Sequence, residues 1–198
     1  MRIAREAARL ISEHGIRDHQ QATSKAATQL GIAGKASLPS AQELEDALRE
    51  YHRLFRADSH PPLLRQRREA ALAAMQFLEA FNPRLVGAVL EGTADTHSAV
   101  CVQVFSEDAD AVSRYLHDQG VPVRVSTRRV RLNRTLWSPC NVLHLDAGGI
   151  PFELLVLPPQ ALRQAPLAGA AEQPVRRGSI SRLQELLEED KPAQPGSA

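Results

Sequence analysis

The pattern of apolar residues changes near Arg84. Before that residue, Ala, Leu, Arg, Glu and Gln are frequent and apolar residues recur every three or four positions, which is the period of an amphipathic helix. After it, β-branched residues become frequent and apolar residues alternate with polar ones, which is typical of strands. The sequence therefore predicts an α+β protein, in which a helical N-terminal part over residues 1–81 precedes a small mixed β-sheet domain over residues 82–160.

Four helices are expected in the first part. They run from Ile3 to a glycine cap at Gly15, from Gln20 to Leu30, from Ser40 through Phe55, and from Leu63 to Phe81. Ser40 stands three residues before Glu43, which is the spacing of a capping box. In the fourth helix we expect Arg65, Arg67 and Arg68 to face water, because the apolar stripe lies on the other side.

From Arg84 to Glu189 the chain is expected to contain five strands and two helices. The strands cover Leu85–Leu90, Ala99–Phe105, Val121–Leu132, Asn141–Asp146 and Pro151–Leu157. One helix, Ala109–Gln119, lies between the second and third strands. Residues 161–190 are predicted to form a loop, in which Arg176 and Arg177 are linker charges, and a C-terminal helix, Ser179–Glu189. Residues 191–198 are predicted to be disordered.

Composition excludes several classes of protein. Basic and acidic residues number 24 and 23, so a net charge of +1 provides no global field that attracts nucleic acid or membranes. No apolar run is long enough to span a membrane and no secretory signal is visible, so we expect a soluble cytoplasmic protein. Cys101 and Cys140 have no zinc-site spacing and are expected to be structural thiols.

Two motifs in the helical part do not support a binding function. The segment Gly31 to Ser37, GIAGKAS, lacks the spacing of a phosphate-binding loop. The first two helices do not form a convincing helix-turn-helix, because the second offers mostly Ala, Gln and Thr and little positive charge. We therefore expect no DNA binding here, whereas the apolar stripes of the helices suit a protein partner or a homo-oligomer.

The stretch from Leu85 to Phe105, with Gly92-Thr93 between two predicted strands, resembles the nucleotidyltransferase superfamily, the DNA polymerase beta-like fold. The resemblance covers about residues 82–157. In that family a strand ends in Gly-Ser or Gly-Gly, the next strand carries Asp-hydrophobic-Asp, and a later strand carries a third carboxylate. The resemblance implies phosphoryl-type transfer with two Mg²⁺ ions, with Thr93 in the place of the serine. Glu153 is a candidate for the third acid, and it is equally suited to facing solvent or to a salt bridge.

The chain departs from the family where the Asp pair belongs. Ser98 is followed by Ala99 and Cys101 at the two positions, and neither a methyl nor a thiol holds Mg²⁺. The sequence therefore predicts a catalytically degenerate member that binds a nucleotide or a partner, and no cofactor is expected. One alternative is an active enzyme, which uses Mg²⁺ with Asp95 and Glu153. Another is a protein interaction module that binds no nucleotide.

If nucleotide binding is retained, we expect Gly92, Thr93 and Ser98 at the phosphates, with Arg129 and Arg131 supplying charge. These two arginines share a face of a predicted strand, within a basic segment that also has an aromatic residue. The members of this segment are Arg124, Arg128, Arg129, Arg131, Arg134 and Trp137. A solvated sheet face, or a strand edge protected by charge, is the alternative interpretation of the segment.

Overall fold

The structure is a computed structural model that describes residues 2–16, 18–32, 38–55, 60–168 and 173–190. Residues 191–198, predicted to be disordered, and most of the segment Gly31 to Ser37 lie outside the described residues. The chain divides into two compact units. The helical unit comprises Met1–Leu64 with Glu91–Ser98, and the α/β unit comprises Arg65–Leu90 with Ala99–Ala198.

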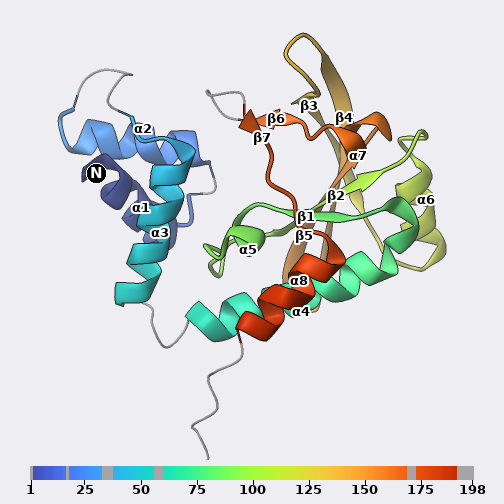
Figure 1. Ribbon diagram of the computed structural model, residues 1–198, viewed down its shortest axis with the longest axis horizontal. Helices are drawn as coiled ribbons and strands as arrows, with labels where there is room; N and C mark the ends of the chain where they lie inside the picture. The colour runs from blue at the N-terminus through green and yellow to red at the C-terminus, as the bar shows by residue number, and fades with distance from the viewer. Residues whose placement is uncertain (1, 17, 33–37, 56–59, 169–172, 191–198) are drawn as a thin grey trace, which may run out of the picture. The chain divides into compact units, whose positions relative to one another are not determined.

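Three helices build the helical unit: α1 (Arg2–His14), α2 (His19–Gln29) and α3 (Ala41–Phe55) (Figure 1). Their shared core combines leucines, such as Leu10 and Leu44, with alanines that let the helices approach closely. The predicted capping box at the start of α3 is confirmed. The Glu43 amide donates to the Ser40 hydroxyl at 3.2 Å, and the Ser40 amide donates to the Glu43 carboxylate at 2.8 Å.

The α/β unit contains a mixed sheet, which confirms the predicted α+β class. Among the described residues seven strands pair in the order β1-β2-β5-β4-β3-β6-β7. Their bounds are β1 Arg84–Val86, β2 Val100–Phe105, β3 Arg124–Arg131, β4 Trp137–Ala147, β5 Ile150–Leu157, β6 Leu167–Ala168 and β7 Gln173–Pro174. β2 and β5 run parallel, and the other neighbours pair antiparallel.

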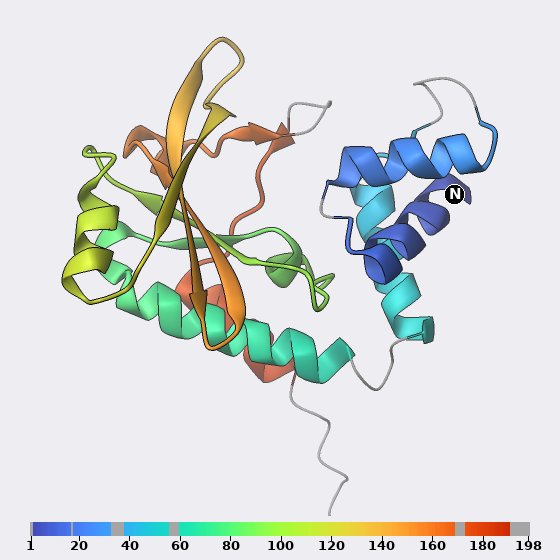
Figure 2. The same ribbon diagram turned by 180° about the vertical axis from the view of Figure 1, so that it is seen from behind.

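The remaining elements of the chain are helices. Their bounds are α4 His60–Phe77, a 3₁₀ turn Glu79–Phe81, α5 Ala88–Glu91, α6 Ala111–Asp118, α7 Gln160–Arg163 and α8 Ile180–Glu189. Figures 1 and 2 show α4 and α8 together on one side of the sheet. None of the helices within the described residues has both the length and the apolar character needed to cross a membrane.

Alternation along β2 separates the two faces of the sheet. Val100, Val102 and Val104 lie on one face and are almost completely buried. Cys101 and Gln103 lie on the other face, which also carries Glu153 of β5. The strict alternation follows from the pleat of the strand, in which successive side chains point in opposite directions.

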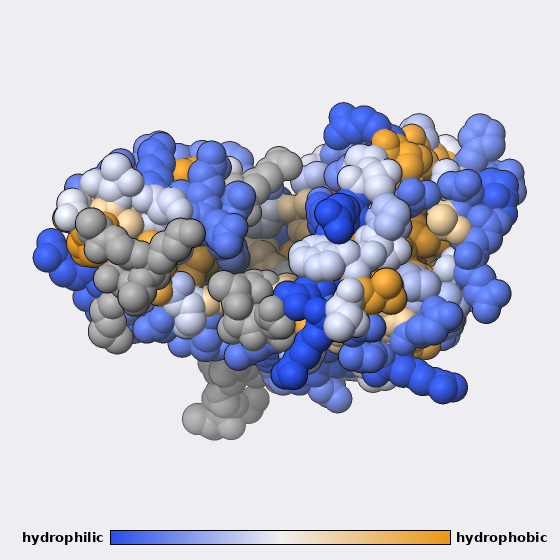
Figure 3. All heavy atoms as spheres, turned by 90° about the horizontal axis from the view of Figure 1, so that it is seen from above, coloured by the Kyte–Doolittle hydropathy of each residue, from blue (hydrophilic) through white to orange (hydrophobic). Residues whose placement is uncertain are grey.

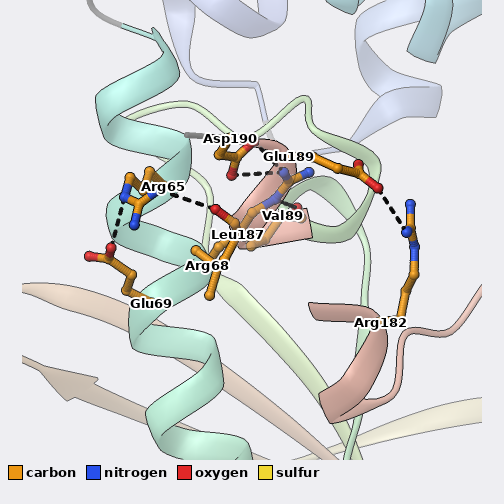
Figure 4. Close-up of polar contacts among 8 residues, drawn as sticks. All are labelled: Arg65, Arg68, Glu69, Val89, Arg182, Leu187, Glu189 and Asp190. Atoms are coloured by element: carbon orange, nitrogen blue, oxygen red, sulfur yellow. Dashed lines mark hydrogen bonds and ion pairs between the residues drawn. The ribbon is translucent and has the colours of Figure 1, made fainter. Parts of the chain in front are cut away.

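Buried polar contacts join α4 to α8 (Figure 4). One amino group of Arg68 donates to both carboxylate oxygens of Asp190, at 2.8 and 2.9 Å, and its Nε donates to the Val89 carbonyl at 3.2 Å. Arg67 is 6% exposed and Arg68 is 5% exposed. The expectation that these two side chains face water is therefore wrong, because the C-terminal helix covers Arg68 and supplies its partner.

The first strand of the sheet is shorter than predicted. A strand was expected over Leu85–Leu90, whereas β1 ends at Val86 and α5 begins at Ala88. Gly87 lies between them with a φ of +73°, a conformation that a glycine adopts without strain and that turns the chain out of the sheet. The pattern predicted a strand because the apolar residues of α5 are too few to show a helical period.

Candidate functional site

The Gly-Thr turn lies in the helical unit, where it contacts α3. The Thr93 hydroxyl donates to the Glu45 carboxylate at 2.9 Å, and the side chain is buried. Arg49 donates to the Glu91 carbonyl at 3.1 Å and so holds the start of the turn. Gly92 has a φ of +78°. The hydroxyl of Thr93 is thus engaged by α3, which reduces its availability to a phosphate.

Asp95 and Ser98 close a turn on each other. The Ser98 hydroxyl donates to the Asp95 carboxylate at 3.0 Å, and the His97 amide donates to the same oxygen at 2.9 Å. The Ser98 oxygen also accepts from the Asp95 amide at 3.0 Å. Asp95 is 4% exposed. This carboxylate is therefore used to shape the loop, a role that Asp side chains commonly have in turns.

The positions of the predicted acid pair lie at the start of β2. Ala99 precedes the strand, and Cys101 within it pairs with Glu153 of the parallel strand β5. Glu153 in turn forms an ion pair of 2.6 Å with Arg128 of β3. Of the three interpretations considered for Glu153, the structure shows the salt bridge. The Glu153 carboxylate is therefore already paired with the guanidinium of Arg128 on the same face of the sheet.

The chemistry available around Cys101 is limited. Across the residues that the structure describes, no three His, Cys, Asp or Glu side chains are grouped so that they could hold a metal ion. The second thiol, Cys140, is buried, and desolvation raises its pKa above the ordinary value, so little thiolate forms near neutral pH. Cys140 is therefore not suited to act as a nucleophile.

Arg177 is partly buried and hydrogen-bonded to the sheet, so the expectation that it is a linker charge is wrong. Its Nε donates to the Gln103 amide oxygen at 2.7 Å, and one amino group donates to the Ala161 carbonyl at 2.7 Å. Its guanidinium also lies 5.2 Å from the centre of the Phe105 ring. Burial lowers the pKa of Arg177, with a smaller contribution from the charge of Arg84. Only the packing of the C-terminal segment onto the sheet could have revealed this position.

The hairpin formed by β3 and β4 brings Arg129, Arg131 and Trp137 together. Arg131 pairs with Trp137 across the two strands, and the guanidinium carbons of both arginines lie 5.6 Å from the centre of the indole ring. Trp137 is 50% exposed. Arg131 also donates to the Arg134 carbonyl at 2.8 Å. The predicted sharing of one face by the two arginines agrees with the strand register.

The candidate residues are thus distributed over both units. Gly92, Thr93, Asp95 and Ser98 belong to the helical unit. Glu153, Arg129 and Arg131 belong to the α/β unit. Within the α/β unit, Glu153 and its partner Arg128 lie on the face that carries Cys101. Arg129 and Arg131 are one and three residues further along β3 than Arg128, so they lie on the opposite face.

The fold and the site define a mixed α+β protein with a seven-stranded sheet, an ion-paired acid beside a thiol, and a basic hairpin with an exposed tryptophan. No protein-family model matches the chain, and comparisons with curated proteins and with solved structures find no significant match.

Proposed function

We propose that the α/β unit is a catalytically degenerate member of the nucleotidyltransferase-like fold and acts by binding, without phosphoryl-type transfer. The parallel pairing of β2 with β5, which sets Cys101 beside Glu153, carries the proposal. In the superfamily pattern an Asp pair on one strand works with a third carboxylate on a later strand, so the strands that carry them have to be close. Here β2 and β5 are neighbours, and of the three positions only Glu153 holds an acid.

The turn after β1 supports the same assignment with a different register. The family pattern has a glycine directly at the end of the strand. β1 ends at Val86 and Gly87 follows it, so Gly87-Ala88 fits this position better than Gly92-Thr93. With this register the loop that leads to β2 is longer, and Ala88 replaces the hydroxyl residue that the family uses.

The side chains present disfavour the two-metal reaction. Mg²⁺ requires hard oxygen ligands, which the methyl of Ala99 and the thiol of Cys101 do not provide. The ion pair with Arg128 partly neutralises the one carboxylate at hand. A metal ion at this place would have to displace the guanidinium and gain only one protein ligand, so binding without chemistry is the better supported function.

A thermal-shift titration with ATP, CTP, GTP and UTP, each with and without Mg²⁺, tests the proposal, because binding to the native state raises the melting temperature. We expect no Mg²⁺-dependent rise for any nucleotide at millimolar concentration. A Mg²⁺-dependent rise that Glu153→Ala abolishes and Glu185→Ala leaves unchanged would favour the active alternative and refute the proposal. Glu185 is an exposed acid on α8 and serves as the matched control.

Restoring the acid pair gives a positive readout for the assigned positions. The double variant Ala99→Asp with Cys101→Asp would place two carboxylates at the start of β2 beside Glu153, which makes three in total. We expect Mn²⁺ to raise the melting temperature of this variant and not that of the wild type. The double variant with Asn at both positions is the isosteric control, and an equal response of the two variants would contradict the assignment.

A further inference from the structure

The hairpin of β3 and β4 is a concentrated source of positive charge in a chain that is nearly neutral. Between Asp118 and Asp146 the sequence contains five arginines and no acidic residue. They are Arg124, Arg128, Arg129, Arg131 and Arg134. Arg128 forms an ion pair with Glu153 of β5, and the hairpin itself contains no acidic residue before Asp146. A surface of this kind attracts polyanions locally even though the net charge is only +1.

Four of the five arginines lie on β3, an extended strand with exposed side chains. β3 spans eight residues, so its length is about 26 Å at roughly 3.3 Å per residue. In the described chain β3 pairs with β4 along its whole length, and on its other side it pairs with β6 only at Arg131. Positions 124 to 129 are exposed. By the register of the strands, Arg129 and Arg131 lie on the face that carries Trp137, and Arg124 and Arg128 lie on the other face, so β3 presents positive charge on both faces.

An aromatic residue lies on the same face as Arg129 and Arg131 and is placed for stacking. Trp137 and Leu136 are about half exposed, at 50% and 49%, although side chains of this size are usually buried. Arg129 and Arg131 flank the indole ring at 5.6 Å each. Cation–π contacts of this kind hold the ring in place and set two positive charges beside it, and the residue stays half exposed. An indole with adjacent guanidinium groups combines a platform for a base with groups for the neighbouring phosphates.

A hollow lies beside the turn of the hairpin. Its volume is about 430 Å³, and it is lined by Asn133, Arg134, Thr135, Gln164, Leu167 and Pro174. Arg134 and Gln164 provide hydrogen-bond donors for phosphate or base edges, and Leu167 and Pro174 provide apolar surface. Figure 3 shows strongly hydrophilic residues interspersed with apolar ones over the α/β unit, the mixture that such a surface requires.

We propose that the face of the β3–β4 hairpin with Arg129, Arg131 and Trp137 binds single-stranded nucleic acid, with a base stacked on Trp137 and phosphates on the arginines. This inference names a ligand class for the proposed function. It depends on that function in one respect, that the α/β unit acts by binding. A second copy of the chain is a poor occupant, because pairing two β3 edges would oppose arginine to arginine. A duplex is a poor occupant as well, because its bases present no free face for stacking.

The chain offers a reporter within the site, since Trp137 is its only tryptophan. Titration with oligouridylate and oligothymidylate of about ten nucleotides, within the range of single-strand binding sites, should quench the tryptophan fluorescence saturably. The logarithm of the affinity should fall with the logarithm of the salt concentration with a slope of about −2, the value for about three phosphates neutralised on a single strand.

Variants measured by anisotropy of a labelled oligonucleotide separate stacking from charge. Trp137→Leu should weaken binding by about tenfold or more, and Trp137→Phe should weaken it less, because phenylalanine retains an aromatic face. Arg129→Gln should reduce both the affinity and the salt slope. Arg182→Gln, which removes an exposed arginine of α8 and makes the same change in net charge, should have no effect.

Three outcomes would overturn the inference: no quenching at submillimolar oligonucleotide, equal binding of a duplex, or equal binding after Trp137→Leu. Displacement by polyglutamate of similar length at the same charge concentration would point to an acidic protein partner instead. The nucleotide titration remains separate from these tests. A Mg²⁺-dependent shift there refutes the proposed function whatever the oligonucleotide does, and failure of the oligonucleotide alone refutes only this inference.

Discussion

Arg68 illustrates how one side chain depends on a distant part of the chain. Its guanidinium is buried, and its charge is balanced by Asp190 at the end of α8. A buried charge is costly unless it is paired and hydrogen-bonded, and here the carboxylate and the Val89 carbonyl meet both needs. The Arg68 side chain of α4 is therefore buried at low cost only when α8 is docked and brings Asp190 beside it.

Asp190→Ala should lower the free energy of unfolding by about 3 kcal/mol, because it leaves the buried charge of Arg68 without its partner. The midpoint of urea denaturation measures the change. Glu189→Ala, which removes a neighbouring acid from an exposed ion pair with Arg182, should have a clearly smaller effect. Equal losses in the two variants would show that the buried pair has no special role.

At the level of single elements, α3 shows how a local signal determines where a helix begins. Ser40 and Glu43 satisfy each other's backbone amides at the start of the helix, and both partners lie within four residues of sequence. Accepting the Ser40 amide, and secondarily its hydroxyl, lowers the pKa of Glu43 below its ordinary value of 4.5. The ionised form is thus favoured in the folded state.

Glu43→Gln should lower the free energy of unfolding at neutral pH. In acid the variant and the wild type should differ less, because the wild-type carboxyl is then protonated. A carboxyl whose pKa is lower when folded stabilises the protein above its unfolded pKa, and that contribution disappears as the pH falls through the folded value. Urea denaturation followed by far-UV circular dichroism measures the free energy of unfolding of both proteins at neutral pH and well below pH 4.5. Glu50→Gln on the same helix is the control, and a difference from wild type that does not depend on pH would contradict the expectation.

β1 shows the opposite case, an element whose extent no local signal defines. The apolar run from Leu85 to Leu90 suits a strand or a short helix equally. The pairing with β2 stops at Val86, and the positive φ of Gly87 redirects the chain into α5. The boundary was therefore predictable only from knowledge of which strand lies beside β1.

At the scale of the α/β unit, the C-terminal segment closes the sheet next to β1. Leu85 and Gly178 exchange two backbone hydrogen bonds, of 2.9 and 2.8 Å, across a long separation in sequence. A Cβ atom on Gly178 would lie 2.7 Å from a terminal methyl of Leu90. The absence of a side chain at position 178 thus permits the close approach of the two segments.

Gly178→Ala should destabilise the protein by about 1 kcal/mol, because the added methyl forces Leu90 to move within a packed region. Leu90→Val removes the obstructing methyl, so the double variant should be more stable than the sum of the two single changes predicts. Urea denaturation of the wild type, the two single variants and the double variant gives the double-mutant cycle. Strict additivity would show that the two positions do not interact.

By itself the sequence determined the longer helices, most strands, the capping box and the basic character of the hairpin, because these depend on periodicity, caps and composition within a few residues. The tertiary structure alone decided that Glu153 lies beside Cys101 and Arg128, and that the Thr93 hydroxyl is engaged by Glu45. The pairing of Arg68 with Asp190 and of Arg177 with Gln103 was decided in the same way. Such pairings join residues far apart in sequence, and the energy of a buried polar group depends on which partner the fold brings to it.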